Sequence, residues 1–325
     1  MNIMKVGKLD NGTLERLIIN KIKCRRPEVK KSAAVGEDCA VIDFGEYNCV
    51  ISTDPITGAV NDIGRLAVNV SCNDIASNGV EPLGILLTVL LPPSVTEEQM
   101  SQIMADAADE AAKLNIEILG GHTEITPVVT VPVISATALG RQIASGAVDR
   151  NIEPGDLFVM TKAAGIEGTG IIVSDYGDEL TDVLTEEERS FAVSLLDNTS
   201  VVKEGVIAGK MGIGPMHDIT EGGVLGAIWE LCRISGVGAD IDTAKVPLYD
   251  VTEKVCSHYG LNPYRLISSG SMMMAVQPEK YDALMTELKE AGIGAACIGR
   301  AVMQGEGTDI AAPTADELFK VIHRK

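Results

Sequence analysis

Strand-like and helix-like segments alternate along the whole chain, and this alternation constrains the fold more than any other feature. The apolar run from Leu83 to Leu91 stops at Pro92-Pro93 and predicts a buried strand. The capping-box pattern at 96–99 (Thr-Glu-Glu-Gln) then predicts the start of a helix. Similar alternation resumes after residue 156. We therefore expect an α/β (α+β) protein.

The first half is expected to be rich in strands and to contain two long helices. One helix should end at Gly79, which stands where a C-terminal cap is expected. The glycine pair Gly120-Gly121 is interpreted as a turn between two strands. The predicted strands are 39–44, 48–53, 83–91, 116–119 and 128–138, and the predicted helices are 63–78 and the one that follows Thr96.

A domain boundary is expected within residues 140–156, where glycines and Pro154 lie among polar residues. A chain of 325 residues also suits two domains better than one. We therefore expect domains at 1–150 and 151–325. In the second half the predicted strands are 157–161, 237–242, 271–276 and 295–302, and the predicted helices are 185–197, 200–210, 221–235 and 279–291.

Composition excludes several classes of function. The chain is 46% hydrophobic and 22% charged, as in soluble globular proteins, and its net charge of −19 argues against nucleic acid as a partner. No apolar run approaches the roughly 20 residues needed to span a bilayer, and Met1 to Asp10 lack the apolar core of a signal peptide. The seven scattered cysteines show no zinc-ligand spacing. We expect a cytoplasmic protein with no membrane association.

Four aspartates at the ends of apolar elements or beside glycines suggest a site for a hard cation. Asp38 follows Gly36 before a strand, Asp54 ends another, and Asp74 lies in a largely uncharged helix. Carboxylates suit Mg²⁺, which is usually completed by water and substrate phosphates. Each has a simpler alternative: a solvated turn for Asp38, an Asx-Pro turn for Asp54 and a helix surface for Asp74. ATP with Mg²⁺ is the first hypothesis.

Two glycine segments are candidates for phosphate contact. Gly120-Gly121 would allow the backbone to approach a ligand, and Thr123 could hydrogen-bond a phosphate, although hairpin turns use the same residues. Asp218 precedes Thr220, a candidate helix cap, and the following glycines at 222–223 could present backbone N–H groups to phosphate. The Walker A pattern is absent from the sequence.

The cysteines and methionines suggest packing more than catalysis. Cys24 is the only thiol with obvious cationic neighbours, which could lower its pKa. Cys39, Cys72, Cys232 and Cys297 lie in apolar contexts that favour the core. The run 272–274 of three methionines favours a buried strand over a cofactor site.

Taken in order, eight short segments resemble those of the aminoimidazole-ribonucleotide-synthetase-related superfamily. Its members include that purine enzyme, selenophosphate synthetase, thiamine-monophosphate kinase and the hydrogenase expression/formation protein. The segments are Gly36-Glu37-Asp38-Cys39-Ala40-Val41, Ser52-Thr53-Asp54, Asn73 to Pro82, Gly120-Gly121-His122-Thr123, Pro154-Gly155-Asp156, Gly165-Ile166-Glu167-Gly168-Thr169, His217 to Gly223 and Ser268-Ser269-Gly270.

The resemblance implies an amino-terminal domain that forms a homodimer through a shared strand barrel and a carboxy-terminal α/β domain. It implies ATP in a long cleft, with Mg²⁺ held on the phosphates by four carboxylates. By this resemblance the metal ligands are Asp38, Asp54, Asp74 and Asp218, and the nucleotide site is lined by Asp54, Asn73, Gly120, Gly121 and Thr123.

Within the superfamily the hydrogenase-maturation branch fits best, through residues 218–223 and the segment 260–263. It implies an ATP- and Mg²⁺-dependent enzyme that activates an oxygen of a small-molecule or carrier-protein substrate by phosphoryl transfer. A small-molecule kinase or synthetase, and a nucleotide-binding assembly partner without turnover, stay open as alternatives. That branch ends in a carbamoyl-carrying cysteine, whereas this sequence ends His323-Arg324-Lys325 after a predicted short helix at 316–322, so we expect no thiocarbamate on this chain.

Overall fold

The computed structural model describes residues 9, 11–57, 62–146, 150–313 and 315–322. The final residues 323–325, and all of residues 1–10 except Leu9, lie outside the described residues, so the expectations made there are not addressed by the structure. Among the residues described, no helix is both long and apolar enough to cross a membrane.

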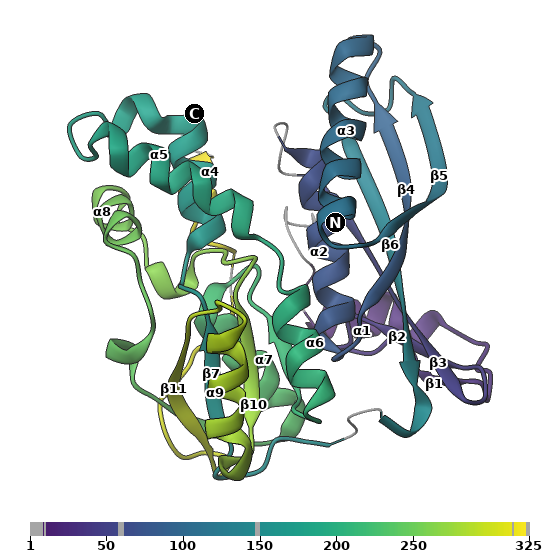
Figure 1. The fold of residues 1–325 in the computed structure, drawn as a ribbon, viewed down its shortest axis with the longest axis vertical. Coiled ribbons are helices and arrows are strands. Elements are labelled where there is room, and N and C mark those ends of the chain that lie inside the picture. Colours follow the sequence, from purple (N-terminus) through teal and green to yellow (C-terminus); the bar gives the residue numbers. More distant parts are fainter. Residues whose placement is uncertain (1–8, 10, 58–61, 147–149, 314, 323–325) are drawn as a thin grey trace.

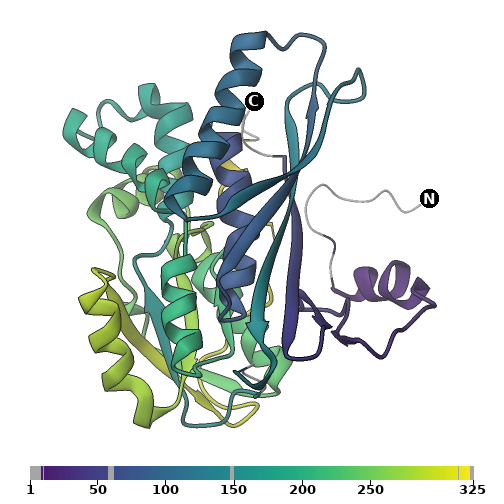
Figure 2. The same ribbon diagram turned by 45° about the vertical axis from the view of Figure 1, so that its right-hand side comes forward.

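The first half of the described chain builds a six-stranded sheet with helices on one face (Figures 1 and 2). The strand order is β1-β2-β3-β6-β4-β5, and only β4 and β5 run parallel. The strands are β1 (Val29–Lys31), β2 (Ala40–Asp43), β3 (Tyr47–Ile56), β4 (Pro82–Leu91), β5 (Glu117–Ile125) and β6 (Val133–Ile143). The helices are α1 (Asn11–Leu17), η1 (Ile19–Lys21), α2 (Ile63–Ser77), α3 (Glu97–Lys113) and η2 (Ala144–Gly146).

Local sequence signals explain where the two long helices begin and end. Thr96 and Gln99 form both hydrogen bonds of the predicted capping box at the start of α3. Helix α2 ends before Gly79, whose φ of 71° is in the left-handed region that favours glycine. Both predicted helices are therefore confirmed, and the capping box predicted at Thr185 is also formed.

The second half builds a five-stranded antiparallel sheet in the order β8-β10-β7-β11-β9. Its strands are β7 (Leu157–Thr161), β8 (Met216–Asp218), β9 (Gly238–Ile241), β10 (Met272–Val276) and β11 (Ala295–Val302). The helices are α4 (Ile166–Tyr176), α5 (Glu186–Ser194), α6 (Val202–Lys210), α7 (Gly223–Ser235), α8 (Asp250–Tyr259), α9 (Tyr281–Glu290) and α10 (Phe319–Ile322). Short 3-10 turns are η3 (Gly177–Leu180), η4 (Leu195–Asn198), η5 (Thr243–Lys245), η6 (Pro263–Arg265) and η7 (Pro278–Lys280).

Strand β10 of this second sheet is buried on both faces. Met273 packs in one apolar cluster with Ile228 of α7, whereas Met272 and Met274 pack in another with Leu284 of α9. Every residue of β10 is buried, as expected for a strand covered on both sides. The predicted buried methionine strand is confirmed.

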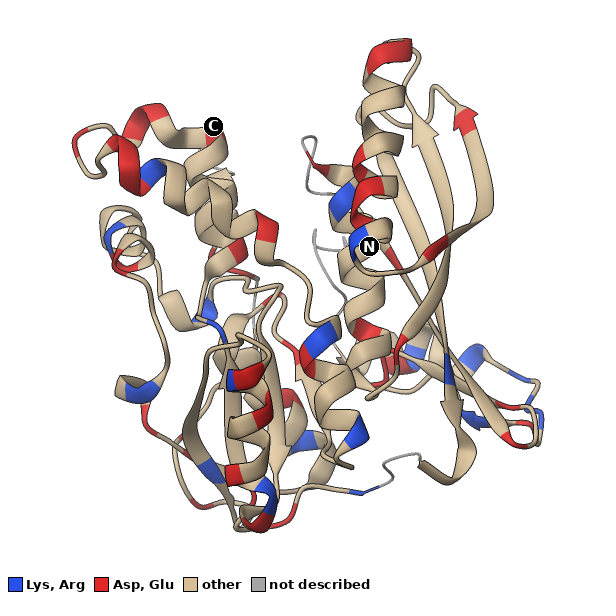
Figure 3. Ribbon diagram, in the orientation of Figure 1, with Lys and Arg blue, Asp and Glu red and all other residues tan. Residues whose placement is uncertain are grey.

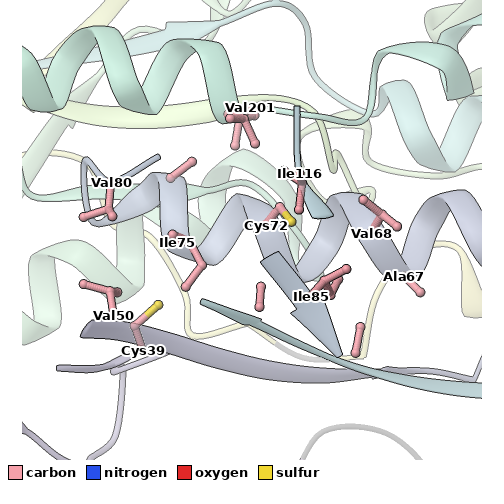
Figure 4. Packing of buried hydrophobic residues seen from close by; sticks show 14 of the residues in the cluster. Cys39, Val50, Ala67, Val68, Cys72, Ile75, Val80, Ile85, Ile116 and Val201 are labelled. Carbon is pink, nitrogen blue, oxygen red and sulfur yellow. The ribbon is translucent and has the colours of Figure 1, made fainter. Parts of the chain in front are cut away.

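The two halves share one apolar core around α2. Ile75 and Cys72 of α2 belong to the same cluster as Val50 of β3 and Val201, which immediately precedes α6 (Figure 4). Gly205 of α6 lies so close to α2 that an added Cβ would be 2.2 Å from the carbonyl oxygen of Ala76. Helix α2 therefore packs against both halves of the chain.

Several sequence predictions differ from the structure. Residues 120 and 121 lie inside strand β5, so the turn predicted there is wrong, and the following strand occupies 133–143 instead of 128–138. Helix α4 was not predicted because it is buried on most of its surface and therefore lacks a polar face. Helix α8 and strand β8 were also not predicted.

Candidate functional site

Helix α2 carries a buried carboxylate that faces the neighbouring strand β3. Asp74, in the last turn of α2, has only 6% of its surface exposed. Ser52 Oγ on β3 lies 2.5 Å from Asp74 Oδ2 and 3.0 Å from the backbone carbonyl oxygen of Asp38. The alternative that Asp74 lies on a solvated helix surface is therefore wrong. Through Ser52, Asp74 connects helix α2 with strand β3 and with the segment that contains Asp38.

The surroundings of Asp74 favour its protonated form. Burial is the largest cause, and the charges of Asp218, Asp54 and Asp38 together with a hydrogen bond to Asp54 add to it, so the pKa of Asp74 is raised well above its usual range. The carbonyl of Asp38 can only accept a hydrogen bond. When Ser52 donates its single proton there, a protonated Asp74 can donate to Ser52 in turn.

Asp218 brings a second buried carboxylate from the other sheet. It ends strand β8, is 2% exposed, and donates its backbone N–H to Ser77 Oγ of α2 at 3.1 Å. Ser77 Oγ is also 3.4 Å from Asp218 Oδ1, whereas Asp218 Oδ2 is buried with no hydrogen-bond partner among the described residues. A buried carboxylate oxygen without a partner is costly, which indicates that a ligand belongs beside it.

His217 connects this aspartate to helix α7. Its Nε2 lies 2.8 Å from Glu230 Oε2, and its Nδ1 lies 3.5 Å from Asp218 Oδ1. Burial opposes the charged imidazolium, but the nearby carboxylates of Asp218, Glu230 and Asp38 outweigh it and raise the pKa of His217 well above its usual range. No role was expected from the sequence for either His217 or Glu230, and only the motif around Asp218 pointed to the histidine.

Asp38 and Asp54 complete the acidic group. Asp38 is exposed in the segment before β2, and Asp54 is half-buried on β3. The structure therefore brings together all four predicted aspartates, from the two sheets and from α2, although the sequence separates Asp38 from Asp218 by 180 residues.

The donor set fits a cation that keeps part of its water shell. Among the described residues, no group of three or more His, Cys, Asp or Glu side chains is arranged so that it could hold a metal ion by itself. Mg²⁺ does not require such a cage, because one or two carboxylates plus substrate phosphates usually bind it. The partnerless oxygen of Asp218 and the crowding of like charges at Asp74 fit a cation at this place.

The glycine pair has a structural role that the sequence analysis did not foresee. Gly121 has a φ of 148°, and an added Cβ would lie 1.8 Å from the carbonyl oxygen of Leu87 on β4. Because the pairing of β4 and β5 shifts register here, only glycine permits the close approach. Gly120, Gly121 and Thr123 are all exposed, and their place in a nucleotide site stays a prediction.

Asn73 is fully buried and holds the two halves together. Its Nδ2 donates to the carbonyl oxygen of Thr199 at 2.8 Å, and its Oδ1 accepts from the backbone N–H of Val201 at 2.8 Å. Both ends of the amide are thus occupied by backbone groups next to α6. The geometry supports a positioning role for Asn73, and its predicted place in the nucleotide site stays a prediction.

The start of α7 differs from its prediction. The cap residue is Gly222 with a φ of 86°, so the prediction of Thr220 as the cap is wrong. The N–H of Gly222 donates to Asp316 Oδ2 at 2.8 Å, and the other oxygen of Asp316 accepts from the N–H groups of Ile267 and Leu318. A carboxylate of the chain itself therefore occupies the position proposed for phosphate. Burial raises the pKa of Asp316 to about 6.

The glycine motif at 165–170 surrounds another buried acid. Glu167 accepts a hydrogen bond from the backbone N–H of Ser269 at 3.2 Å. Burial raises its pKa to about 7, opposed by that hydrogen bond and assisted by the charges of Asp316 and Glu221. These contacts connect the motif to the segment 268–270, which the sequence analysis identified separately.

The cysteines are distributed largely as predicted. Cys39, Cys72 and Cys232 are buried, Cys297 is half-buried in β11, and Cys24 is exposed. Burial raises the pKa of the Cys72 thiol to about 12, with a further contribution from Asp74, which fits a core residue and not a nucleophile.

Both halves match described protein families. Residues 36–142 match the family "AIR synthase related protein, N-terminal domain", and residues 153–311 match "AIR synthase related protein, C-terminal domain". The exact domain boundary predicted at residue 150 stays a prediction.

Named relatives cover most of the chain. It is 28% identical to the "Putative hydrogenase expression/formation protein MJ0676" of Methanocaldococcus jannaschii over 84% of this chain and 82% of that one. It is 26% identical to carbamoyl dehydratase HypE of Rhodobacter capsulatus (85% and 79% covered) and 27% identical to a selenide, water dikinase of Colwellia psychrerythraea (82% and 83% covered). The names of the last two relatives denote enzymes.

Solved structures share the fold. A crystal structure of a HypE-HypF complex matches with a TM-score of 0.71 at 22% identity, covering 86% of this chain and 93% of that one. Hydrogenase maturation protein HypE in complex with ATP matches with a TM-score of 0.67 at 20% identity, covering 92% and 88%. These matches confirm the predicted two-domain α/β fold. The chain belongs to the AIR synthase related protein family.

Proposed function

We propose that this chain is an ATP- and Mg²⁺-dependent enzyme that activates an oxygen of its substrate by phosphoryl transfer. The observation that carries the proposal is the convergence of Asp38, Asp54, Asp74 and Asp218, with a buried oxygen of Asp218 left without a partner. A cation and the phosphates it carries would satisfy that oxygen and relieve the repulsion between the acids.

The residues divide into ligands and supports. The four aspartates would hold Mg²⁺, which when bound neutralises charge on the transferring phosphate. Ser52 fixes the side chain of Asp74, Ser77 accepts a hydrogen bond from the backbone N–H of Asp218, and Asn73 fixes α2 against α6. His217 is held by Glu230 and places its Nδ1 3.5 Å from Asp218 Oδ1. Preorganised charges of this kind account for much of catalysis in phosphoryl transfer.

A hydrogenase-maturation role is supported by the names of two relatives that cover most of the chain. The solved HypE-HypF complex pairs a relative of the same fold with a protein partner, and this supports a carrier-protein substrate for the present chain as well. A small-molecule kinase is the second candidate, favoured by the 27% identity to a selenide, water dikinase.

We also propose a homodimer built on the first sheet. The face of this sheet away from α2 and α3 exposes apolar side chains, among them Leu86 at 41% and Leu119 at 48%. Contiguous exposed apolar surface of this kind marks an interaction site. A second copy placed there would cover these residues and bring a partner surface beside Gly120, Gly121 and Thr123.

Calorimetric titration with Mg·ATP tests the site. Asp218→Asn keeps the shape and removes the charge, and we expect its affinity to fall about tenfold or more, equivalent to at least about 1.4 kcal/mol. Asp309→Asn, on an exposed residue, is the matched control and should bind like the wild type. Wild-type affinity in Asp38→Asn, Asp74→Asn and Asp218→Asn alike would refute the assignment.

A phosphate-release assay separates enzyme from binder. Wild-type protein should hydrolyse ATP faster when a cognate small-molecule or carrier-protein substrate is added, and Asp218→Asn should not. Tight Mg·ATP binding with no turnover, across hydrogenase-maturation partners and candidate small-molecule acceptors, would favour a nucleotide-binding assembly protein.

A further inference from the structure

A large cavity lies between the two halves, apart from the acidic site. Its volume is about 980 Å³, and it lies among the end of α3, helix α6 and the loops that follow β7 and α9. None of the four aspartates lines it. The volume is within the range of small-molecule sites in proteins, which is roughly 300–1,000 Å³.

One side of helix α6 lines this cavity and carries lysines at both ends with apolar residues between them. Lys203 and Lys210 are seven residues apart and so share one side of the helix, with Val206 and Ile207 between them. Figure 3 shows basic segments at both ends of α6. Because an α-helix rises about 1.5 Å per residue, the Cα atoms of the two lysines are about 10 Å apart along the helix axis. Apolar surface from Leu114, Leu248 and Ile293 continues the central stripe.

The charge in the cavity is opposite to that of the protein. Four lysines and two glutamates line it, in a chain with 27 basic and 46 acidic residues. Lys162 lies 2.6 Å from Glu204 Oε1 and also donates to the carbonyl oxygens of Ser200 and Gly270, so this lysine and Glu204 neutralise each other.

The remaining lysines leave positive charge for a ligand. Lys113 is paired with Glu110 at 3.0 Å. Lys203 donates to the carbonyl oxygen of Ala291, which leaves its charge unbalanced. Lys210 is exposed and has no ion pair or side-chain hydrogen bond among the described residues. The only other carboxylate in the lining is Glu81, which is exposed.

We propose that this cavity is a second binding site, for a small organic anion with an apolar body. The apolar body would lie along Val206 and Ile207, and its anionic group would pair with Lys203 or Lys210. Lys162 connects this cavity to the acidic centre. It donates a hydrogen bond to the carbonyl oxygen of Gly270, which lies two residues before strand β10, and β10 pairs with β8, the strand that ends at Asp218. This inference does not depend on the proposed phosphoryl transfer.

The probe for this site is 8-anilinonaphthalene-1-sulfonate, which joins one sulfonate to an aromatic body. We expect the double variant Lys203→Glu/Lys210→Glu to bind the probe at least about fivefold more weakly than the wild-type protein by fluorescence titration, or about 1 kcal/mol. Lys21→Glu/Lys23→Glu makes the same charge change on exposed residues far along the chain and should bind within about twofold of wild type.

Two further measurements locate the probe. Binding should persist in Asp218→Asn, which separates this cavity from the proposed metal site. In the wild-type protein, the probe should slow acetylation of Lys203 and Lys210, read by peptide mass spectrometry, and leave Lys21 and Lys23 unchanged. This readout stands even if the double variant does not fold. Unchanged affinity in a folded double variant, or equal acetylation with and without the probe, would overturn the proposal.

Discussion

The two sheets of this protein differ in how they are covered. The central strands β7 and β10 of the second sheet are buried almost throughout, whereas the first sheet exposes leucines on one face. The other face of the first sheet is covered by α2 and α3 (Figure 1). An exposed apolar face of this kind marks an interaction site. The difference is the basis for the proposal that a second copy of the chain covers the first sheet.

The acidic site lies where these two halves meet. Asp54 and Asp38 come from the side of the one-faced sheet, Asp218 comes from an edge strand of the covered sheet, and α2 carries Asp74 between them. A buried group of like charges requires rigid surroundings, which the shared core around α2 provides. The contrast between the sheets can be tested through stability as well as activity.

The largest effect should come from truncating the covered sheet. Met274 is fully buried in β10, and Met274→Ala should lower the free energy of unfolding by about 2–5 kcal/mol, because it leaves a cavity between packed layers. Met303→Ala is the matched control, since Met303 is 61% exposed and should change stability by less than about 0.5 kcal/mol. Chemical denaturation measures both, and equal effects would contradict the two-faced burial.

The free energy of unfolding should also depend on pH through Glu167, which lies in the second half of the chain. Its pKa is raised to about 7 in the fold from 4.5, chiefly by burial, so the stability it contributes is full below about pH 4.5 and is lost as pH rises through about 7. Between pH 5 and 8 the wild-type protein should therefore lose about 2–3 kcal/mol relative to Glu167→Gln. Glu279→Gln, on an exposed side chain, should run parallel to wild type. A parallel Glu167→Gln curve would contradict the assignment.

The elements that the sequence predicted correctly are those whose structure depends on residues close to them in the chain. The capping box at Thr96, the end of α2 before Gly79 and the apolar β10 depend on local geometry and periodicity. Gly121 was misinterpreted because its conformation is decided by the approach of Leu87, 34 residues earlier. The cap of α7 was missed because its partner Asp316 follows 94 residues later.

The sequence predicted the acidic residues of the site but not the residues that hold them in position. The four aspartates followed from residue type and from a resemblance of ordered motifs, but nothing in their spacing showed that they converge. Ser52 and Ser77 lie inside the motifs that carry the resemblance but were given no role, and Glu230 has an ordinary sequence context. The roles of all three follow only from their distances to Asp74, Asp218 and His217.

A smaller effect should follow from cutting the link between the halves. Asn73→Ala would leave the N–H of Val201 and the carbonyl of Thr199 buried without partners, and should lower the free energy of unfolding by about 2 kcal/mol. Asn20→Ala, on an exposed residue, is the control. Because α2 carries Asp74, affinity for Mg·ATP should fall together with stability. A stability loss with full affinity would confine Asn73 to packing.

The smallest effect on unfolding should come from the exposed face of the first sheet, where assembly should change instead. Leu86 is 41% exposed on β4, so Leu86→Ser removes only part of the burial of a core leucine and should lower the free energy of unfolding of an isolated chain by about 1 kcal/mol. In a dimer the same side chain is covered, and its loss should weaken association at micromolar concentration. Val193→Ser, at an equally exposed position on α5, should leave assembly unchanged because α5 belongs to the covered half. Light scattering over a dilution series gives the oligomeric state of each. A wild-type protein that is monomeric throughout, or a Leu86→Ser variant that dimerises as tightly as wild type, would show that this apolar face is not covered by a second copy.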